Sequence, residues 1–291
     1  MKPWRLAAVA LLAIPLLAAC GGPSDGANPK TQGLSVVTSF YPLQYVAERI
    51  AGDHASVTNL TQPGREPHDL ELTVRQTASI ADADVVAYEK GFQPDIDDAI
   101  DQNGPEHVVD AATVARLEGN DPHFWLDPRR LGEVAVAFER QIADVDASHA
   151  RAYARNLASL QADLKHLDAS FQHGLNHCRV DTIVVSHDAF GYLGRRYGLS
   201  VVGINGLSPD AEPSPAHVRQ LQDLIRSDGI TTVFSERLAS REFADSIAND
   251  LGIRAAVLDP IEGLSDATAD QDYLSLMRMN LSALQHANGC S

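Results

Sequence analysis

The chain has 291 residues and carries 23 Lys and Arg against 39 Asp and Glu, a formal net charge of −16 at pH 7 with histidine neutral. This excess of negative charge disfavours nucleic acid as a partner and favours solubility near a surface or the handling of cations. The length is typical of one large domain or of two lobes, because domains commonly have about 100 to 200 residues.

The first 19 residues have the pattern of an export signal. Lys2 and Arg5 precede an apolar run, Leu6 to Ala19, that is shorter than the roughly 20 residues of a membrane span. The run ends in LAAC, which resembles a bacterial lipobox, so we expect Cys20 to be lipidated. The alternative is an ordinary cleaved signal. The protein is therefore expected to be extracytoplasmic and anchored to the bacterial cell membrane as a lipoprotein.

Residues 20–33 are rich in Gly, Pro, Ser and Asn, as flexible tethers are. Beyond them, short β-rich runs alternate with helical patterns, which is typical of parallel βαβ units. The expected strands are 34–40, 56–61, 84–89, 107–112, 181–186, 200–204, 231–236 and 254–259. The pattern predicts an α/β fold with two lobes, 34–145 and 178–291, each with a mainly parallel four-stranded sheet flanked by helices.

Residues 146–177 predict one long helix between the lobes. The segment has no proline, and no glycine before Gly174, and its apolar residues recur at steps of three and four. About 28 helical residues would make a rod of about 42 Å, long enough to join both lobes rigidly. The alternative is a pair of shorter helices with a break between them.

Two cysteines, Cys178 and Cys290, remain if Cys20 is lipidated. An even pair in an oxidising compartment favours a disulfide, here between the start of the second lobe and the C-terminus. Two free thiols are the alternative. The sequence has no C-x-x-C pair, so we expect neither a redox site nor a thiolate metal site.

The common enzyme motifs are missing: the sequence has no G-x-x-x-x-G-K-[ST], no H-E-x-x-H, no G-x-S-x-G and no G-x-G-x-x-G after a strand. The stretch SHD at 186–188 contains the residue types of a catalytic triad. However, adjacent residues cannot easily point at each other as a triad requires. We therefore do not expect an enzyme.

Three histidines and an aspartate share a position in the predicted topology. His68, His123 and His187 follow the second, fourth and fifth expected strands, and Asp259 ends the eighth. Open parallel sheets bind ligands beyond the carboxyl ends of their strands. Three imidazoles and one carboxylate suit a tetrahedral divalent metal. The alternative is that each histidine is only solvated or caps a helix.

Local sequence would fix two of these histidines. A Thr73-x-x-Gln76 capping box is expected to open the helix after His68. His123 lies in DPHFWLDP, where the first proline extends the chain before it and the second fixes the next helix start. A stiff loop suits a metal ligand, because a zinc–nitrogen bond of about 2.0 Å tolerates little ligand motion.

Four stretches resemble signatures of the metal-binding lipoprotein receptors of bacterial ABC importers, the zinc and manganese receptor family. They are PGREPHDLELT, DPHFWLDP, VVSHDAFGYLGRRYGL and LDPIEGL, and they occur in the family's order. The resemblance implies metal between two lobes, with His68, His123 and His187 as ligands. Asp259 is the favoured fourth ligand and Glu262 the alternative.

The resemblance also bears on which metal is bound. Manganese receptors tend to carry glutamate where His187 stands, so an imidazole there favours zinc. One feature departs from the family: many zinc receptors have a long His- and acid-rich loop between the first two ligands. In this chain the stretch VARLEGNDPHF is short and has no histidine before His123. The sequence therefore does not predict an auxiliary role of that loop in zinc capture.

The function implied by the resemblance is capture of Zn²⁺ between the lobes and its delivery to the membrane permease of an ABC importer, which works with a cytoplasmic ATPase. Besides that permease, the expected partner is the membrane surface, through the lipid anchor. We expect a monomer that does not bind nucleic acid. The alternatives are a manganese or mixed-metal receptor, a secreted zinc hydrolase, or a surface lipoprotein whose metal is only structural.

Overall fold

The computed structural model describes Met1 and residues 33–291. The expected signal, the lipidated Cys20 and the tether fall outside these residues, apart from Met1 and Gly33. Among the helices of the described residues, none combines the length and the apolar character that a membrane span needs. Residues Gly33–Ser291 form one unit, and the fold below is that of this unit.

Four parallel strands form the N-terminal sheet, in the order β2-β1-β3-β4. Helices cover both faces, so a central strand such as β3 is buried along its whole length. The strands are β1 (Leu34–Thr38), β2 (Ala55–Asn59), β3 (Val85–Tyr88) and β4 (Val108–Asp110). The α-helices are α1 (Tyr41–Ala51), α2 (Val74–Ala81), α3 (Pro94–Asn103), α4 (Ala111–Ala115) and α5 (Pro128–Val145), with 3₁₀ turns at Gly52–His54 and Phe124–Leu126.

The C-terminal sheet is also parallel throughout, in the order β6-β5-β7-β8. Its strands are β5 (Thr182–Val185), β6 (Ser200–Gly203), β7 (Thr232–Ser235) and β8 (Arg254–Val257). Its α-helices are α7 (Gly191–Tyr197), α8 (Pro215–Ser227), α9 (Glu242–Leu251) and α10 (Tyr273–Asn288), with a 3₁₀ turn at Asp266–Thr268. The predicted fold class, two lobes with parallel four-stranded sheets, is confirmed.

The two sheets have the same strand order, so β1 to β4 correspond in turn to β5 to β8. The correspondence continues beyond the strands. The amide of Thr61, after β2, donates to the carbonyl of Ser39, after β1 (3.2 Å), and the amide of Asn205, after β6, donates to that of Ser186, after β5 (2.8 Å). Ser39 and Ser186 therefore occupy equivalent places at the carboxyl ends of corresponding strands.

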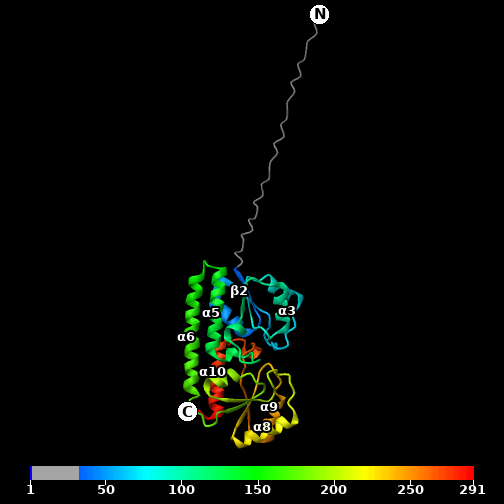
Figure 1. Cartoon of the computed structure of the whole chain (residues 1–291), viewed down its shortest axis with the longest axis vertical. Helices are drawn as coiled ribbons and strands as arrows, with labels where there is room; N and C mark the ends of the chain where they lie inside the picture. The colour runs from blue at the N-terminus through cyan, green and yellow to red at the C-terminus, as the bar shows by residue number, and fades with distance from the viewer. Residues whose placement is uncertain (2–32) are drawn as a thin grey trace. The chain divides into compact units, whose positions relative to one another are not determined.

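The predicted linking helix is present and unbroken as α6 (Ala150–Gly174). It begins later than expected because Asp146 ends α5 and accepts hydrogen bonds from the hydroxyls of Ser148 and Tyr153, which stabilise a turn. Its 25 residues span about 38 Å. Figure 1 shows α6 beside α5, and it packs against α1 and α5 in the N-terminal lobe and α10 in the C-terminal lobe.

The predicted disulfide between Cys178 and Cys290 is confirmed. It closes a segment of 112 residues and ties the start of the C-terminal lobe to the end of the chain. Part of its environment is apolar, since both cysteines pack against the main hydrophobic core. That core contains residues of both sheets and of α6, so the two lobes share one continuous apolar interior.

Candidate metal centre

His68 lies in the loop between β2 and α2. The Pro67 carbonyl before it accepts a hydrogen bond from the buried Gln93 amide (3.1 Å), and the predicted capping box at the start of α2 is present. The imidazole packs edge-on against the Phe92 ring, with centroids 4.7 Å apart. The loop is thus fixed on both sides of His68, whose side chain remains 13% exposed.

His123 is fully buried, and the DPHFWLDP segment that carries it is attached to the C-terminal lobe. The Trp125 indole donates to the Pro260 carbonyl (2.7 Å), and the Tyr273 hydroxyl donates to the Trp125 carbonyl (2.6 Å). Asp121 Oδ1 accepts from the His123 amide (3.1 Å) and lies 2.9 Å from its Nδ1. The short constrained segment therefore fixes both the ring and its free nitrogen, Nε2.

His187 lies two residues beyond β5 and is also fully buried. Its amide and its Nδ1 both contact Oε1 of Glu236, at 3.2 and 2.8 Å. Glu236 directly follows β7, the neighbour of β5, so the register of two adjacent strands brings the carboxylate to the ring. A hydrogen bond at Nδ1 leaves Nε2 of His187 as the nitrogen available to a metal.

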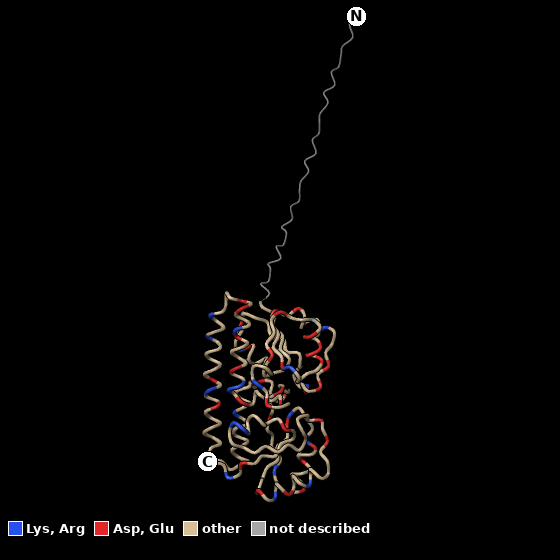
Figure 2. Tube along the Cα trace, viewed as in Figure 1, with Lys and Arg blue, Asp and Glu red and all other residues tan. Residues whose placement is uncertain are grey.

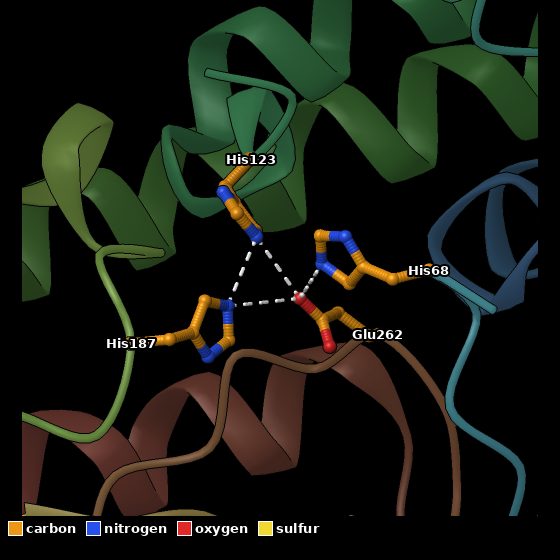
Figure 3. Close-up of side chains that lie close together, drawn as sticks. All are labelled: His68, His123, His187 and Glu262. Atoms are coloured by element: carbon orange, nitrogen blue, oxygen red, sulfur yellow. Dashed lines mark hydrogen bonds and ion pairs between the residues drawn. The ribbon is translucent and has the colours of Figure 1, made fainter. Parts of the chain in front are cut away.

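The structure brings His68, His123 and His187 together with Glu262 (Figure 3). One ligand atom from each residue lies within 4.8 Å of the others. Glu262 Oε1 is 3.0 Å from Nε2 of His123, 3.4 Å from that of His68 and 3.5 Å from that of His187. Among the described residues this is the one group of three or more His, Cys, Asp or Glu side chains with such geometry.

Asp259, the residue favoured from the sequence, lies outside this group, and Glu262, the alternative, lies within it. The Asp259 carboxylate is 3.1 Å from Nε of Arg237 and accepts a hydrogen bond from the amide of Ile261 (2.8 Å). The Asn280 side chain bonds both its amide and its carbonyl. Asp259 therefore fixes the turn before Glu262. In that turn Ile261 has a φ of 60°, which β-branched residues rarely adopt.

The model of one family, zinc-uptake complex component A, periplasmic (ZnuA), matches residues 36–287. The chain belongs to this family. The resemblance to zinc receptors seen in four short stretches is thus confirmed across most of the chain, and the family is one of uptake components rather than of enzymes.

Two curated relatives illustrate the match. The chain is 31% identical over 276 residues to zinc-binding lipoprotein AdcA of Streptococcus pneumoniae R6, covering 87% of this chain and 55% of AdcA. It therefore spans about half the length of that relative. It is 30% identical over 310 residues to high-affinity zinc uptake system protein ZnuA of Bacillus subtilis 168, covering 98% of this chain and 97% of that protein.

Solved structures share the architecture. The laminin binding protein Lmb of Streptococcus agalactiae, described as having adhesin and metal transporting activity, superposes with a TM-score of 0.82 at 30% identity, covering 88% of this chain and 99% of that one. The Zn(II)-bound ZnuA-like domain of Streptococcus pneumoniae AdcA superposes with a TM-score of 0.78 at 30% identity, with the same coverage.

The electrostatics of the four-residue group are dominated by its one carboxylate. Burial alone would raise the pKa of Glu262, but its contacts with the three imidazoles hold that pKa well below the usual range. Burial alone would lower the pKa of His187, but Glu236 and Glu262 raise it to about 10. For His123, burial is likewise outweighed by Asp121 and Glu262, so its pKa is raised. Without a metal, protonated imidazoles therefore balance the charge of these carboxylates, and an arriving cation must displace those protons.

Two carboxylates that contact the histidines, Asp121 and Glu236, were not assigned a role from the sequence. Each accepts from Nδ1 of a buried imidazole, which fixes the ring and raises the basicity of Nε2. The position of Asp121, two residues before His123 in the same motif, could have indicated its role. No local signal links Glu236 to His187, because the two are 49 residues apart.

Proposed function

We propose that the protein captures Zn²⁺ with His68, His123, His187 and Glu262 and delivers it to the membrane permease of an ABC importer. The single observation that carries the proposal is the convergence of three imidazole Nε2 atoms on one carboxylate oxygen. Two residues come from each lobe, so one ion would bridge the lobes. Each chain holds all four residues, which supports a monomer as the working unit.

The donor set supports zinc rather than manganese. Three nitrogen atoms and one carboxylate oxygen suit tetrahedral Zn²⁺, whereas Mn²⁺ prefers sites dominated by carboxylate, carbonyl and water oxygens. The zinc-binding and zinc-uptake names of the relatives support the same ion. A manganese or mixed-metal receptor is the nearest competing function.

Four protein ligands support binding rather than hydrolysis. A catalytic zinc keeps one position open for water, whereas a site closed by four side chains has no such position. His123 and His187 are 0% exposed and Glu262 is 1% exposed, so of the four residues only His68 has appreciable contact with solvent. Zn²⁺ is therefore cargo in this proposal and not a catalyst.

Delivery would take place at the membrane surface, with the protein anchored through a lipid on Cys20. The name of AdcA as a lipoprotein supports this anchor, and the periplasmic family description supports a place outside the cytoplasm. Figure 2 shows acidic residues on both lobes of the described unit, which would attract cations towards the protein. Salt limits the reach of this attraction to about 8–10 Å.

The proposal is tested by metal analysis of the purified mature protein. We expect about one zinc per chain, lost when His68, His123, His187 or Glu262 is replaced by alanine. His166→Ala is the matched control, because His166 is exposed on α6, far along the chain from the four residues. Zinc retained by the four variants would refute the site, and Mn²⁺ competing equally with Zn²⁺ would refute the choice of metal.

A further inference from the structure

Glu89 is a buried carboxyl group with no hydrogen-bond partner. The residue follows β3 directly and is 2% exposed, yet neither Oε1 nor Oε2 is bonded to any group of the described residues. Burying a polar group without a partner costs free energy, so such groups in folded proteins call for an explanation. The backbone carbonyl of Glu89 accepts a hydrogen bond from the Phe92 amide, so it is the side chain that lacks a partner.

The corresponding position in the other lobe is Glu236, which has a partner. Ala87 pairs with Thr38 in the N-terminal sheet, and Phe234 pairs with Val185 in the C-terminal sheet. Glu89 lies two residues beyond Ala87, and Glu236 lies two residues beyond Phe234. Both are 2% exposed, so the two lobes bury a glutamate at the same place.

The residue opposite each glutamate differs between the lobes. Two residues beyond Val185 is His187, whose Nδ1 contacts Glu236 at 2.8 Å. Two residues beyond Thr38 is Phe40, whose ring packs against those of Phe92 and Trp125. A phenyl ring has no hydrogen-bonding group, so Glu89 cannot orient a metal ligand as Glu236 does. The orientation of a metal ligand explains why Glu236 is buried, and it does not explain why Glu89 is buried.

Glu89 lines a pocket of about 300 Å³ that His68 also lines. Lys90, Phe92 and Pro122 contribute to its wall from the N-terminal lobe, and Leu207 and Ser208 contribute from the C-terminal lobe. His68 is the one member of the four-residue group with an exposed side chain, at 13% against 0 or 1%. The pocket therefore adjoins the group on the side of its most exposed ligand.

The charge around this pocket favours a cation. Burial, and after it the charges of Asp110, Asp121 and Asp97, raise the pKa of Glu89 well above its usual value. With no cation present, the carboxyl group therefore keeps its proton, and an arriving cation must displace that proton. Lys90 is the one lysine or arginine that lines the pocket, and it is exposed. Such a pocket would hold a cation weakly, as a site that passes its ion onward must.

We propose that the pocket between Glu89 and His68 is a second binding site, which holds a hydrated divalent cation before the ion reaches the four-residue site. This inference rests on the proposed capture of Zn²⁺. Glu89 supplies a carboxylate oxygen to the ion, and His68 is the first permanent ligand that the ion meets. The second site changes how fast zinc arrives and leaves, whereas the four-residue site sets how tightly it is held.

The test measures the association rate of Zn²⁺ with the metal-free mature protein by stopped flow, as zinc chloride at low ionic strength. In Glu89→Gln we expect a rate roughly tenfold lower, because the amide cannot release a proton and become the carboxylate that concentrates the cation in the pocket. A change of about tenfold is the low end of such an effect on the association rate. Glu89→Asp keeps the carboxylate and should keep most of the rate. Glu106→Gln removes an exposed charge by the same substitution and should leave the rate as it is.

Thermal unfolding of the metal-free variants checks that each is folded. A rate for Glu89→Gln equal to that of the unchanged protein would overturn the proposal, as would equal slowing by Glu106→Gln. If Glu89→Gln does not fold, slowing in Glu89→Asp by as much as tenfold would also count against it, since aspartate keeps a carboxyl group that can release its proton to a cation. Failure of the proposed function differs from all of these, because zinc would then bind as tightly after His187→Ala.

Discussion

The ring of His187 in the C-terminal lobe is fixed by a carboxylate at Nδ1, whereas the ring of His68 in the N-terminal lobe has no such partner among the described residues. Glu236 bonds both the amide and Nδ1 of His187, and the ring is fully buried. His68 has no hydrogen-bond partner at Nδ1 among the described residues, and its side chain is 13% exposed. Its ring is positioned mainly by packing against Phe92.

Equal strand order does not give equal sites in the two lobes. Both lobes bury a glutamate after corresponding strands, but an imidazole stands opposite Glu236 and a phenyl ring opposite Glu89. The C-terminal lobe therefore uses its glutamate to orient a ligand. The equivalent glutamate of the N-terminal lobe has no hydrogen-bond partner among the described residues, and it lines a pocket that His68 also lines.

The largest expected effect comes from removing the more firmly held ligand. His187→Ala should weaken zinc binding at least roughly 100-fold, because four-ligand zinc sites contribute about 10–16 kcal/mol in total. His68→Ala should lose roughly tenfold less, because water can reach its position and take the vacated coordination place. Competition with a chelator of known affinity measures both. Equal losses would mean that the two ligands are held alike.

A smaller effect is expected when the orientation of His187 is disturbed and the ligand itself is kept. Glu236→Gln should weaken zinc binding about 10- to 100-fold, the range typical of carboxylates that support a metal-bound histidine. The shape of the side chain is retained, so zinc stoichiometry at saturation should remain near one. Glu106→Gln serves as the control in the same titration. An unchanged dissociation constant for Glu236→Gln would show that the contact with Nδ1 has no role in affinity.

The smallest effect on zinc is expected at Asp259. Asp259→Asn keeps an oxygen for the Ile261 amide but removes the charge that faces Arg237, so it should leave zinc stoichiometry intact. The free energy of unfolding should fall by about 1–3 kcal/mol, the usual cost of disturbing a buried hydrogen-bonded group. Chemical unfolding and metal analysis measure the two quantities. Loss of zinc as complete as in Glu262→Ala would return Asp259 to the group of ligands.

Much of the fold could be predicted because its signals are local. The alternation of β-rich and helical runs predicted all eight strands, and the spacing of apolar residues predicted α6 as one helix. Its start was misplaced by four residues, because the side-chain bonds of Asp146 that form the turn after α5 are not visible as periodicity. The disulfide followed from the number of cysteines left after Cys20.

The sequence by itself determined which residues could form the site: three histidines and an acid, each beyond the carboxyl end of a strand. These residues are expected to lie close together because the carboxyl ends of parallel strands lie at the same edge of a sheet, where ligands bind. Only the tertiary structure decided between Asp259 and Glu262, because the choice depends on Arg237 and Asn280, which lie far from them in the chain. The tertiary structure also decided that Glu236 contacts an imidazole and Glu89 does not. The pairing of strands far apart in the chain sets which side chains face each other, and no local pattern in the sequence reveals that pairing.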